Sequence, residues 1–410
     1  MPATKLIPFN EFRKGLRSAR HEDLAKLTFF AVKTPDHFEE MREHLIGYYE
    51  PLEATHSFKD DSGQVWDCIP AELQPALKKS GRAMAKPVDI PGEKRGQDGK
   101  RLHQSMLNRD ERDDEGNVRN CPRGSIPLRR ITLEDISRFH SLEEFFQKSP
   151  TKRALKPVAD IIDEWGNFVH KYAHAYQDVA NLGGHSFLNV WAPKLTGDEV
   201  FSLSQHWYAA GPDDTIQTVE AGWQVYPEKY NTNMPCLFVY WTADGYHNTG
   251  SYNNEKHEFV QTGNQWALGE ALKASTAGGD QEEIEISWFL DQGNWWLYIN
   301  GTAAENALGY YPASYYGAGP MSQGAASIDY GGEVVGDVSW PQMGSGAFPS
   351  AGYRQAAYHR NIAYYSADGN TYDANLDPQQ DFPNCFKIAP GSNADWRSFF
   401  FYGGPGGNNC

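Results

Sequence analysis

The sequence predicts a mainly β protein, in which an antiparallel β-sandwich follows a smaller α+β N-terminal part. Two sequence styles meet near residue 160, and eleven of the twelve tryptophans lie beyond it. There, aromatic and β-branched runs recur between Gly, Pro, Asn and Asp, which is typical of short strands joined by turns. Because no helical stretch of useful length separates these runs, two stacked sheets are the simplest arrangement. We therefore expect an N-terminal part over residues 1–155 and a sandwich over residues 160–410.

Helical signals are confined to the N-terminal part. Residues 36–45 carry apolar side chains at helical spacing. Thr132 stands three residues before Asp135, which resembles a capping box at a helix start. Residues 91–120 are polar and predict an exposed loop, and residues 147–160 resemble a linker.

Ten segments beyond residue 166 are candidate strands, because each joins aromatic and β-branched residues between turn-forming ones. They are Ser186–Trp191, Phe201–Tyr208, Ile216–Tyr226, Leu237–Ala243, Phe259–Thr262, Ile284–Leu290, Trp295–Ile299, Ile328–Val335, Ala357–Tyr365 and Phe399–Tyr402.

The charge is unevenly placed along the chain. Residues 1–160 hold 28 Lys and Arg against 26 Asp and Glu, whereas residues 161–410 hold 9 against 27. A nucleic-acid interface needs a basic face, and the larger part has few basic residues to make one, so we expect no nucleic-acid partner. Solubility alone explains such acidity; the sharper interpretation is a protein that works at low pH.

No stretch of the sequence approaches the roughly 20 apolar residues of a membrane span, so we expect no membrane partner. The first twenty residues are mixed and charged, without the apolar core of a secretory signal. Either the protein stays inside the cell or its signal is not part of this sequence.

The five cysteines show neither zinc-site spacing nor a Cys-x-x-Cys motif. Pairing within each part predicts two disulfides, Cys68–Cys121 and Cys385–Cys410. Cys236 is then left as a free thiol in an apolar strand, where it can serve as a small buried hydrophobe.

The motifs of several common enzyme classes are absent, namely His-Glu-x-x-His, Gly-x-Ser-x-Gly and the P-loop. His170 and His174 stand at helical spacing, but no third ligand with metal spacing accompanies them. We expect neither a metal nor a cofactor.

Two glutamates stand out by their context. Glu220 lies in Thr218–Tyr226 and Glu333 in Ile328–Val335, each a strand-like run in which glycine lies close to the carboxylate. On a strand, Glu220 shares a face with Gly222 and Gln224, while Trp223 packs on the other face. Glycine within a strand often marks close approach by a ligand or another backbone. The alternative is that both glutamates face solvent on an outer sheet surface.

These segments resemble the neprosin family, the glutamic peptidases known from pitcher-plant digestive fluid. The resemblance runs from about residue 50 to residue 410. Matching stretches in the sandwich are His170–His174, Leu188–Trp191, Phe201–Gln205, Glu220–Val225, Tyr240–Thr242, Phe259–Thr262, Gly331–Val335, Gln342–Gly346 and Phe401–Gly406. Asp67–Ile69, Gln74–Ala76 and Cys121–Arg130 look like the family's activation domain.

The resemblance implies a secreted, acid-acting endopeptidase that cuts after proline and is made as a precursor. Its partners would be proline-containing peptides or proteins and its own inhibitory pro-segment, which is removed at acid pH. The family's two catalytic glutamates fall on Glu220 and Glu333. Residues 250–258 depart from the plant members, which carry a close cysteine pair there.

Hydrolysis by two carboxyl groups requires one ionised and one protonated group. By analogy with other glutamic peptidases, we expect Glu333 to be the base and Glu220 the acid or oxyanion partner. Trp223, Gln224, Tyr240 and Trp241 are candidates for lining a substrate cleft, with core packing as the alternative for the two Trp and for Tyr240. A glycoside hydrolase and a non-catalytic sandwich that binds a glycan or peptide are the other two hypotheses.

Overall fold

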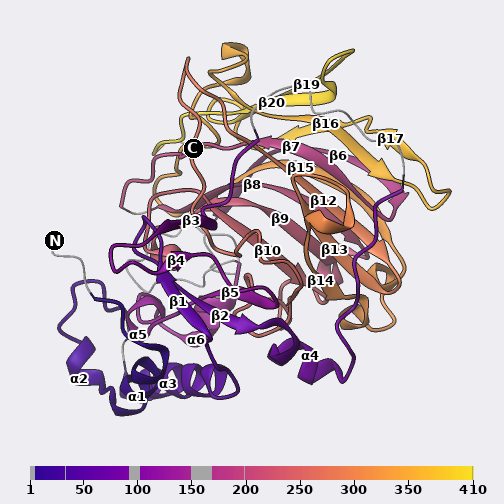
Figure 1. Ribbon diagram of the computed structural model, residues 1–410. Helices are drawn as coiled ribbons and strands as arrows, with labels where there is room; N and C mark the ends of the chain where they lie inside the picture. The colour runs from indigo at the N-terminus through magenta and orange to yellow at the C-terminus, as the bar shows by residue number, and fades with distance from the viewer. Residues whose placement is uncertain (1–4, 33, 92–101, 149–168, 198, 409) are drawn as a thin grey trace.

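Two large antiparallel sheets form the C-terminal part of the protein, and helices with two small sheets form the N-terminal part (Figure 1). The fold is shown by a computed structural model that describes all residues except 1–4, 33, 92–101, 149–168, 198 and 409. The predicted fold class is confirmed. The predicted boundary at residues 155–160 lies outside the described residues. Below, the N-terminal part means residues 5–148 and the sandwich means residues 169–410.

The first sheet of the sandwich carries both candidate glutamates. Its six strands are, in spatial order, β10 (Cys236–Thr242), β9 (Gln217–Val225), β8 (Glu199–Ala210), β15 (Ala325–Gly336), β6 (Val169–Asn181) and β18 (Asp377–Gln380). Every pair along this order is antiparallel. Strand β8 therefore separates the two strands that carry Glu220 and Glu333.

The second sheet has nine strands and supplies the opposite wall of the sandwich. In spatial order they are β11 (Val260–Gln261), β14 (Ala307–Pro312), β13 (Asn294–Ile299), β12 (Glu283–Asp291), β7 (Gly183–Asn189), β16 (Ala357–Tyr365), β20 (Arg397–Gly403) and β19 (Lys387–Asn393), with β17 (Thr371–Asp373) beside β16. All ten predicted strands are present in the two sheets.

The hydrophobic core of the sandwich lies between the two sheets. Alternate residues of β9, such as Val219 and Trp223, are fully buried there with Ile284 and Trp288 of β12. Burying a large apolar side chain contributes about 1.5–3 kcal/mol, so this alternation fixes which face of β9 points inward. Glu220, one residue after Val219, must then point away from the core.

The N-terminal part contains six of the seven α-helices among the described residues. They are α1 (Phe9–Ser18), α2 (His21–Leu24), α3 (Pro35–Tyr49), α4 (Pro75–Ser80), α5 (Leu133–Ile136) and α6 (Leu142–Phe146), whereas α7 (Pro227–Tyr230) belongs to the sandwich. Short 3-10 turns are η1 (Ala71–Leu73), η2 (Asp213–Thr215), η3 (Ala304–Asn306), η4 (Ala313–Tyr316), η5 (Pro320–Ser322) and η6 (Pro349–Ala351). No described helix is long and apolar enough to cross a membrane.

Two sequence signals in this part are confirmed. Helix α3 contains the predicted helical stretch and starts at Thr34, whose side chain accepts a hydrogen bond from the His37 amide. At the start of α5, Thr132 and Asp135 make both reciprocal bonds of a capping box. A three-stranded sheet of β1 (His56–Lys59), β2 (Val65–Pro70) and β5 (Ser125–Arg129) and a hairpin of β3 (Asn108–Arg112) and β4 (Val118–Arg119) complete this part.

The N-terminal part also runs along the nine-stranded sheet (Figure 1). The Ile90 amide donates to the Thr302 carbonyl, and the His103 amide donates to the Glu283 carbonyl. The prediction of an exposed loop over residues 91–120 holds in part for the described residues 102–120. Residues 109–112 and 114–116 are exposed as predicted, but β3 and β4 form there, and Leu102 pairs with Glu283 as an isolated bridge. These contacts join the N-terminal part to the nine-stranded sheet of the sandwich.

Both predicted disulfides are present. Cys68 bonds to Cys121 across 53 residues, and Cys385 bonds to Cys410 across 25. Cys236 is a buried free thiol, as predicted. Each part of the molecule thus has its own covalent cross-link.

Candidate active site

Strand register places Glu220 and Glu333 on the same face of the six-stranded sheet. Glu220 of β9 lies opposite Trp207 of β8, and Glu333 of β15 lies opposite Leu203 of β8. Because residues 203 and 207 are an even number apart, their side chains share a face, and so do the two glutamates. Both glutamates are fully buried. The face that carries them is covered by the N-terminal part rather than by water.

Lys148 of the N-terminal part lies between the two carboxylates. Its Nζ is 2.5 Å from Glu220 Oε2 and 3.0 Å from Glu333 Oε2. The Glu333 contact is an ion pair without hydrogen-bond geometry. A single ammonium that reaches both carboxylates places them in one site. The predicted linker over residues 147–160 is therefore wrong at its start, because Lys148 is buried in this site; residues 149–160 lie outside the described residues.

Glu220 is held by three neutral donors besides Lys148. Its Oε1 accepts hydrogen bonds from the Thr218 hydroxyl at 2.8 Å and the Tyr246 hydroxyl at 2.6 Å. Its Oε2 accepts a bond from the Gln205 amide at 3.0 Å. These donors offset the desolvation of a buried carboxylate, which would otherwise be costly.

Glu333 is held from the neighbouring strand β6. Its Oε1 lies 2.5 Å from His170 Nδ1 and 3.4 Å from the Tyr172 hydroxyl. Burial raises the pKa of Glu333, but the Lys148 ammonium and the His170 contact outweigh it and lower the pKa to about 2. Burial lowers the pKa of Lys148, but Glu220 and Glu333 outweigh it, so this pKa is raised. The base of the proposed pair is therefore ionised while the lysine is present.

The sequence matches two family models over most of its length. Residues 198–405 match the model described as Neprosin, and residues 57–176 match the Neprosin activation peptide. The chain belongs to the neprosin family. Family membership identifies it as a glutamic-type peptidase that carries an activation peptide, and the matched ranges contain Glu220, Glu333 and Lys148.

Solved structures similar to this neprosin-family chain include two peptidases. One is scytalido-glutamic peptidase with a transition state analog inhibitor, at 9% identity and a TM-score of 0.32, covering 57% of this chain and 98% of that one. Another is SCP-B, a member of the Eqolisin family of peptidases in a complex with the tripeptide Ala-Ile-His, at 8% identity and a TM-score of 0.31, covering 57% and 98%. At this low identity and TM-score, neither structure supports the assignment of any residue of the site.

The four predicted cleft-lining residues divide between the two faces of the neprosin-family sheet. Tyr240 lies opposite Glu220 in the register, and Gln224 lies opposite Leu203, so both share the face of the glutamates. Trp223 and Trp241 are buried in the sandwich core instead, so the prediction that they line the cleft is wrong. The reason is strand alternation: neighbouring residues of β9 and β10 point to opposite faces.

Several residues of the site escaped the sequence analysis. Lys148, His170, Tyr172, Gln205 and Tyr246 contact one or both glutamates. The stretches His170–His174 and Phe201–Gln205 were among those that resemble the family, and strand alternation within them would have placed three of these residues beside the glutamates. His170 and His174 belong to β6, so their spacing of four residues reflects one strand face rather than a helix.

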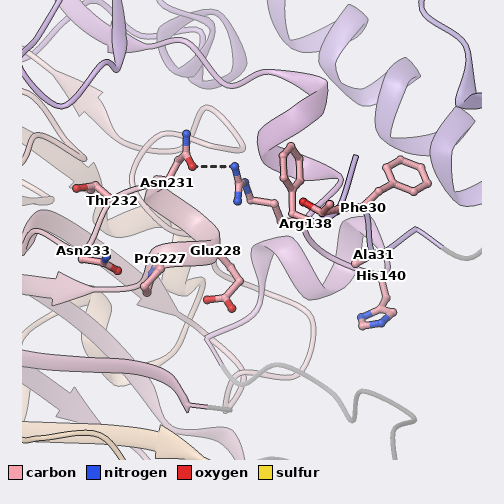
Figure 2. Close-up of a pocket in the computed structure, with 11 residues that line it drawn as sticks. Phe30, Ala31, Arg138, His140, Pro227, Glu228, Asn231, Thr232 and Asn233 are labelled. Atoms are coloured by element: carbon pink, nitrogen blue, oxygen red, sulfur yellow. Dashed lines mark hydrogen bonds between the residues drawn. The ribbon is translucent and has the colours of Figure 1, made fainter. Parts of the chain in front are cut away.

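A large cavity lies elsewhere in the protein (Figure 2). It has a volume of about 610 Å³ and lies between residues 28–31, Arg138 and His140 of the N-terminal part and residues 227–233 of the sandwich. Arg138 Nη2 donates to Asn231 Oδ1 there at 2.7 Å (Figure 2). Neither glutamate lines this cavity, and the Lys148 ammonium lies between their carboxylates.

Proposed function

We propose that the chain is the precursor of an acid-acting glutamic endopeptidase, in which Glu220 and Glu333 hydrolyse the peptide bond. The observation that carries this proposal is the contact of one ammonium, that of Lys148, with both buried carboxylates. A site that holds a cation between two carboxylates can hold a substrate amide and a water molecule there once the cation has left. Other residues of the face can then orient the substrate.

In the proposed reaction, Glu333 is the base and Glu220 is the acid. Glu333 removes a proton from water, and the resulting hydroxide attacks the carbonyl carbon. Protonated Glu220 donates a hydrogen bond to the developing oxyanion and then a proton to the leaving nitrogen. Two nearby carboxyl groups resist joint ionisation, so the pair retains one proton to higher pH than an isolated carboxyl group. This chemistry favours acid.

Inhibition of the precursor follows from the Lys148 contact. The ammonium occupies the position that substrate and water need, and it keeps Glu333 ionised. Uptake of one proton by the pair weakens the attraction for Lys148, so acid favours its departure. Removal of the N-terminal part then makes the opening permanent.

Cleavage after proline and export from the cell complete the proposal. Near Lys148 Nζ lie aromatic rings of the same face, with centroids at 5.2 Å for Trp207 and 6.0 Å for Tyr246. Such rings suit packing against the apolar ring of a proline. Two disulfides suit an oxidising, extracellular compartment.

The test is to incubate the purified chain at acid pH with two peptides that differ only in one central proline or alanine, and to map the products by mass. We expect new termini after proline in the first peptide and much slower cleavage of the second. Equal cleavage of both would reject the proline preference, and cleavage of neither would reject the peptidase.

A further inference from the structure

Gln205 occupies the centre of the face that carries the two glutamates. On β8 it lies between Leu203, opposite Glu333, and Trp207, opposite Glu220. It is therefore the diagonal neighbour of both carboxylates, within reach of a long side chain. Its side chain is fully buried.

The residues directly opposite Gln205 on both neighbouring strands are glycines, Gly222 of β9 and Gly331 of β15. A Cβ atom at Gly222 would lie 1.9 Å from the Ser204 carbonyl oxygen and 2.8 Å from Gln205 Cβ. A Cβ atom at Gly331 would lie 2.5 Å from the Ala173 carbonyl oxygen. Glycine is thus needed for close strand contact, and no side chain lies directly opposite Gln205 on either neighbouring strand.

The two ends of the Gln205 amide are used differently. Nε2 donates to Glu220 Oε2 at 3.0 Å, the same oxygen that Lys148 contacts. Oε1 is buried and has no hydrogen-bond partner among the described residues. A buried acceptor without a partner is uncommon in proteins. This one lies within a site whose opposite end holds an ionised carboxylate.

The neighbours of each glutamate differ in what they can do with a proton. The hydroxyls of Thr218 and Tyr246 and the amide of Gln205 can each accept as well as donate, so Glu220 can be held in either protonation state. Glu333 Oε1 lies 2.5 Å from His170 Nδ1 and Oε2 lies 3.0 Å from the Lys148 ammonium, which can only donate. Among the described residues, the titratable and charged groups that face the pair include Lys148, His170, Tyr172, Tyr240 and Tyr246. The ion pair of His174 with Asp329 lies on the same face of the sheet.

We propose that Gln205 is the positioning residue for the proton of Glu220. While Lys148 is present, the Gln205 amide donates to ionised Glu220. Once Lys148 has left and Glu220 has taken up a proton, the amide turns, and its Oε1 accepts a hydrogen bond from the protonated carboxyl group. The rotation exchanges two ends of nearly equal size about a soft terminal torsion. This inference rests on the proposed function, and it assigns the proton to Glu220 and the base to Glu333.

Gln205 should therefore affect the upper pH limit of activity. An acceptor for the proton of Glu220 stabilises the protonated form, so it extends activity to higher pH. Gln205→Met keeps an unbranched side chain of similar length and removes both donor and acceptor. We expect the alkaline limb of the kcat/KM profile of the acid-activated enzyme to move to lower pH by roughly one unit, a tenfold loss at a pH on that limb.

Gln224→Met is the matched control, because Gln224 lies on the same face and its amide donates to the Tyr252 hydroxyl at 3.2 Å, not to a glutamate. Its limb should stay at the wild-type pH even if the rate falls. Should Gln205→Met fail to fold, Gln205→Asn, whose shorter amide cannot reach Glu220, must show the same shift.

A limb that stays in place or moves to higher pH in the Gln205 variant would overturn the inference and leave the peptidase intact. An inactive wild-type chain would overturn the proposed function and the inference with it.

Discussion

Among the contacts between the N-terminal part and the sandwich, two contain groups that titrate in acid. They differ in charge: one is an ion pair and the other is neutral. One is the lysine plug, the contact of Lys148 with Glu220 and Glu333. The other is the histidine latch, formed by His44 and Tyr48 of α3 with His257 of the sandwich. In the latch, the Tyr48 ring stacks on the His257 ring at 3.8 Å, and His257 Nε2 lies 3.0 Å from the Tyr48 carbonyl oxygen. The plug is charged, whereas burial holds the latch neutral.

The pKa shifts of the latch give it a pH window of its own. Burial and the nearby Lys256 lower the pKa of His44 to about 4, and burial, Lys79 and His44 lower that of His257 to about 4. A folded form that binds fewer protons than the open form loses stability as pH falls. The stability of the latch is thus complete above the ordinary histidine pKa of 6.5 and is lost as pH falls toward 4.

The groups that face the two latch histidines come from several elements. They include the basic Lys79 and Lys256, the acidic Glu255 with its partner Lys229, and Tyr48. The window of the plug is lower. Because the pKa of Glu333 is lowered from 4.5 to about 2, the stability of the plug is present above 4.5 and is lost as pH falls toward 2. Acid should therefore open the latch first and the plug last.

The largest effect should follow from removing the plug. Lys148→Met leaves two buried carboxylates without a cation, and breaking a buried ion pair costs about 3–5 kcal/mol. We expect the full-length chain to lose its inhibition and to be processed at a pH well above that needed by the wild type. Gel analysis of processing against pH measures this shift.

Lys273→Met is the control for the loss of a lysine. Its ion pair with Glu282 at 2.7 Å is solvent-exposed on the lysine side, so little stability depends on it. Processing of Lys148→Met at the wild-type pH would show that Lys148 does not inhibit the precursor.

An intermediate effect is expected from removing the disulfides, because each bridge lies within only one of the two parts. Replacing Cys68 and Cys121 with serine should destabilise the N-terminal part by roughly 2–4 kcal/mol and speed processing, while the mature enzyme keeps its activity. Replacing Cys385 and Cys410 should instead lower the melting temperature of the mature enzyme. Calorimetry and activity after processing distinguish the two; identical behaviour of the pairs would mean that the parts are not separately stabilised.

The smallest effect should come from the latch. His257→Asn removes a titrating ring, and asparagine tolerates the left-handed backbone at this position. The φ angle is 55° at His257, and Asn231 adopts a φ of 54° in the same chain. Between pH 6.5 and 4 the variant should gain one proton fewer on opening, because His257 is absent and His44 remains. Processing at pH ~5 should therefore slow by about tenfold. Processing rates at several pH values check this. A variant that is processed faster at all pH values would mean that the ring only packs.

Strand alternation in the sequence was enough to predict which face of its strand Glu220 takes and that its neighbours are buried. Successive side chains of a strand point to opposite faces, so an apolar face made by every second residue leaves the residues between them on the other face. It was not used to choose among the aromatic residues. Trp241 and Tyr240 are adjacent and equally aromatic, yet one packs in the core and the other lies opposite Glu220. Residue type alone cannot say which face a strand residue takes.

The contact made by Lys148 could not be predicted from the sequence. Lys148 and Glu220 are 72 positions apart in the sequence. The local sequence around the lysine is polar, like that of a linker. Long-range contacts of this kind depend on how two parts pack and leave no local pattern. The spacing of His170 and His174 was misleading for another reason, since positions four apart share a face on a helix and on a strand alike.

The central claim is that Glu220 and Glu333 act as one catalytic pair, and replacing each with glutamine tests it most directly. Glutamine keeps the size of the side chain and removes the titrating proton. We predict that each single variant, measured as acid-activated enzyme on a proline-containing peptide, loses turnover by orders of magnitude. The double variant should lose little more, because residues that act as a unit are not additive. Near wild-type turnover of either single variant at its pH optimum would contradict the claim.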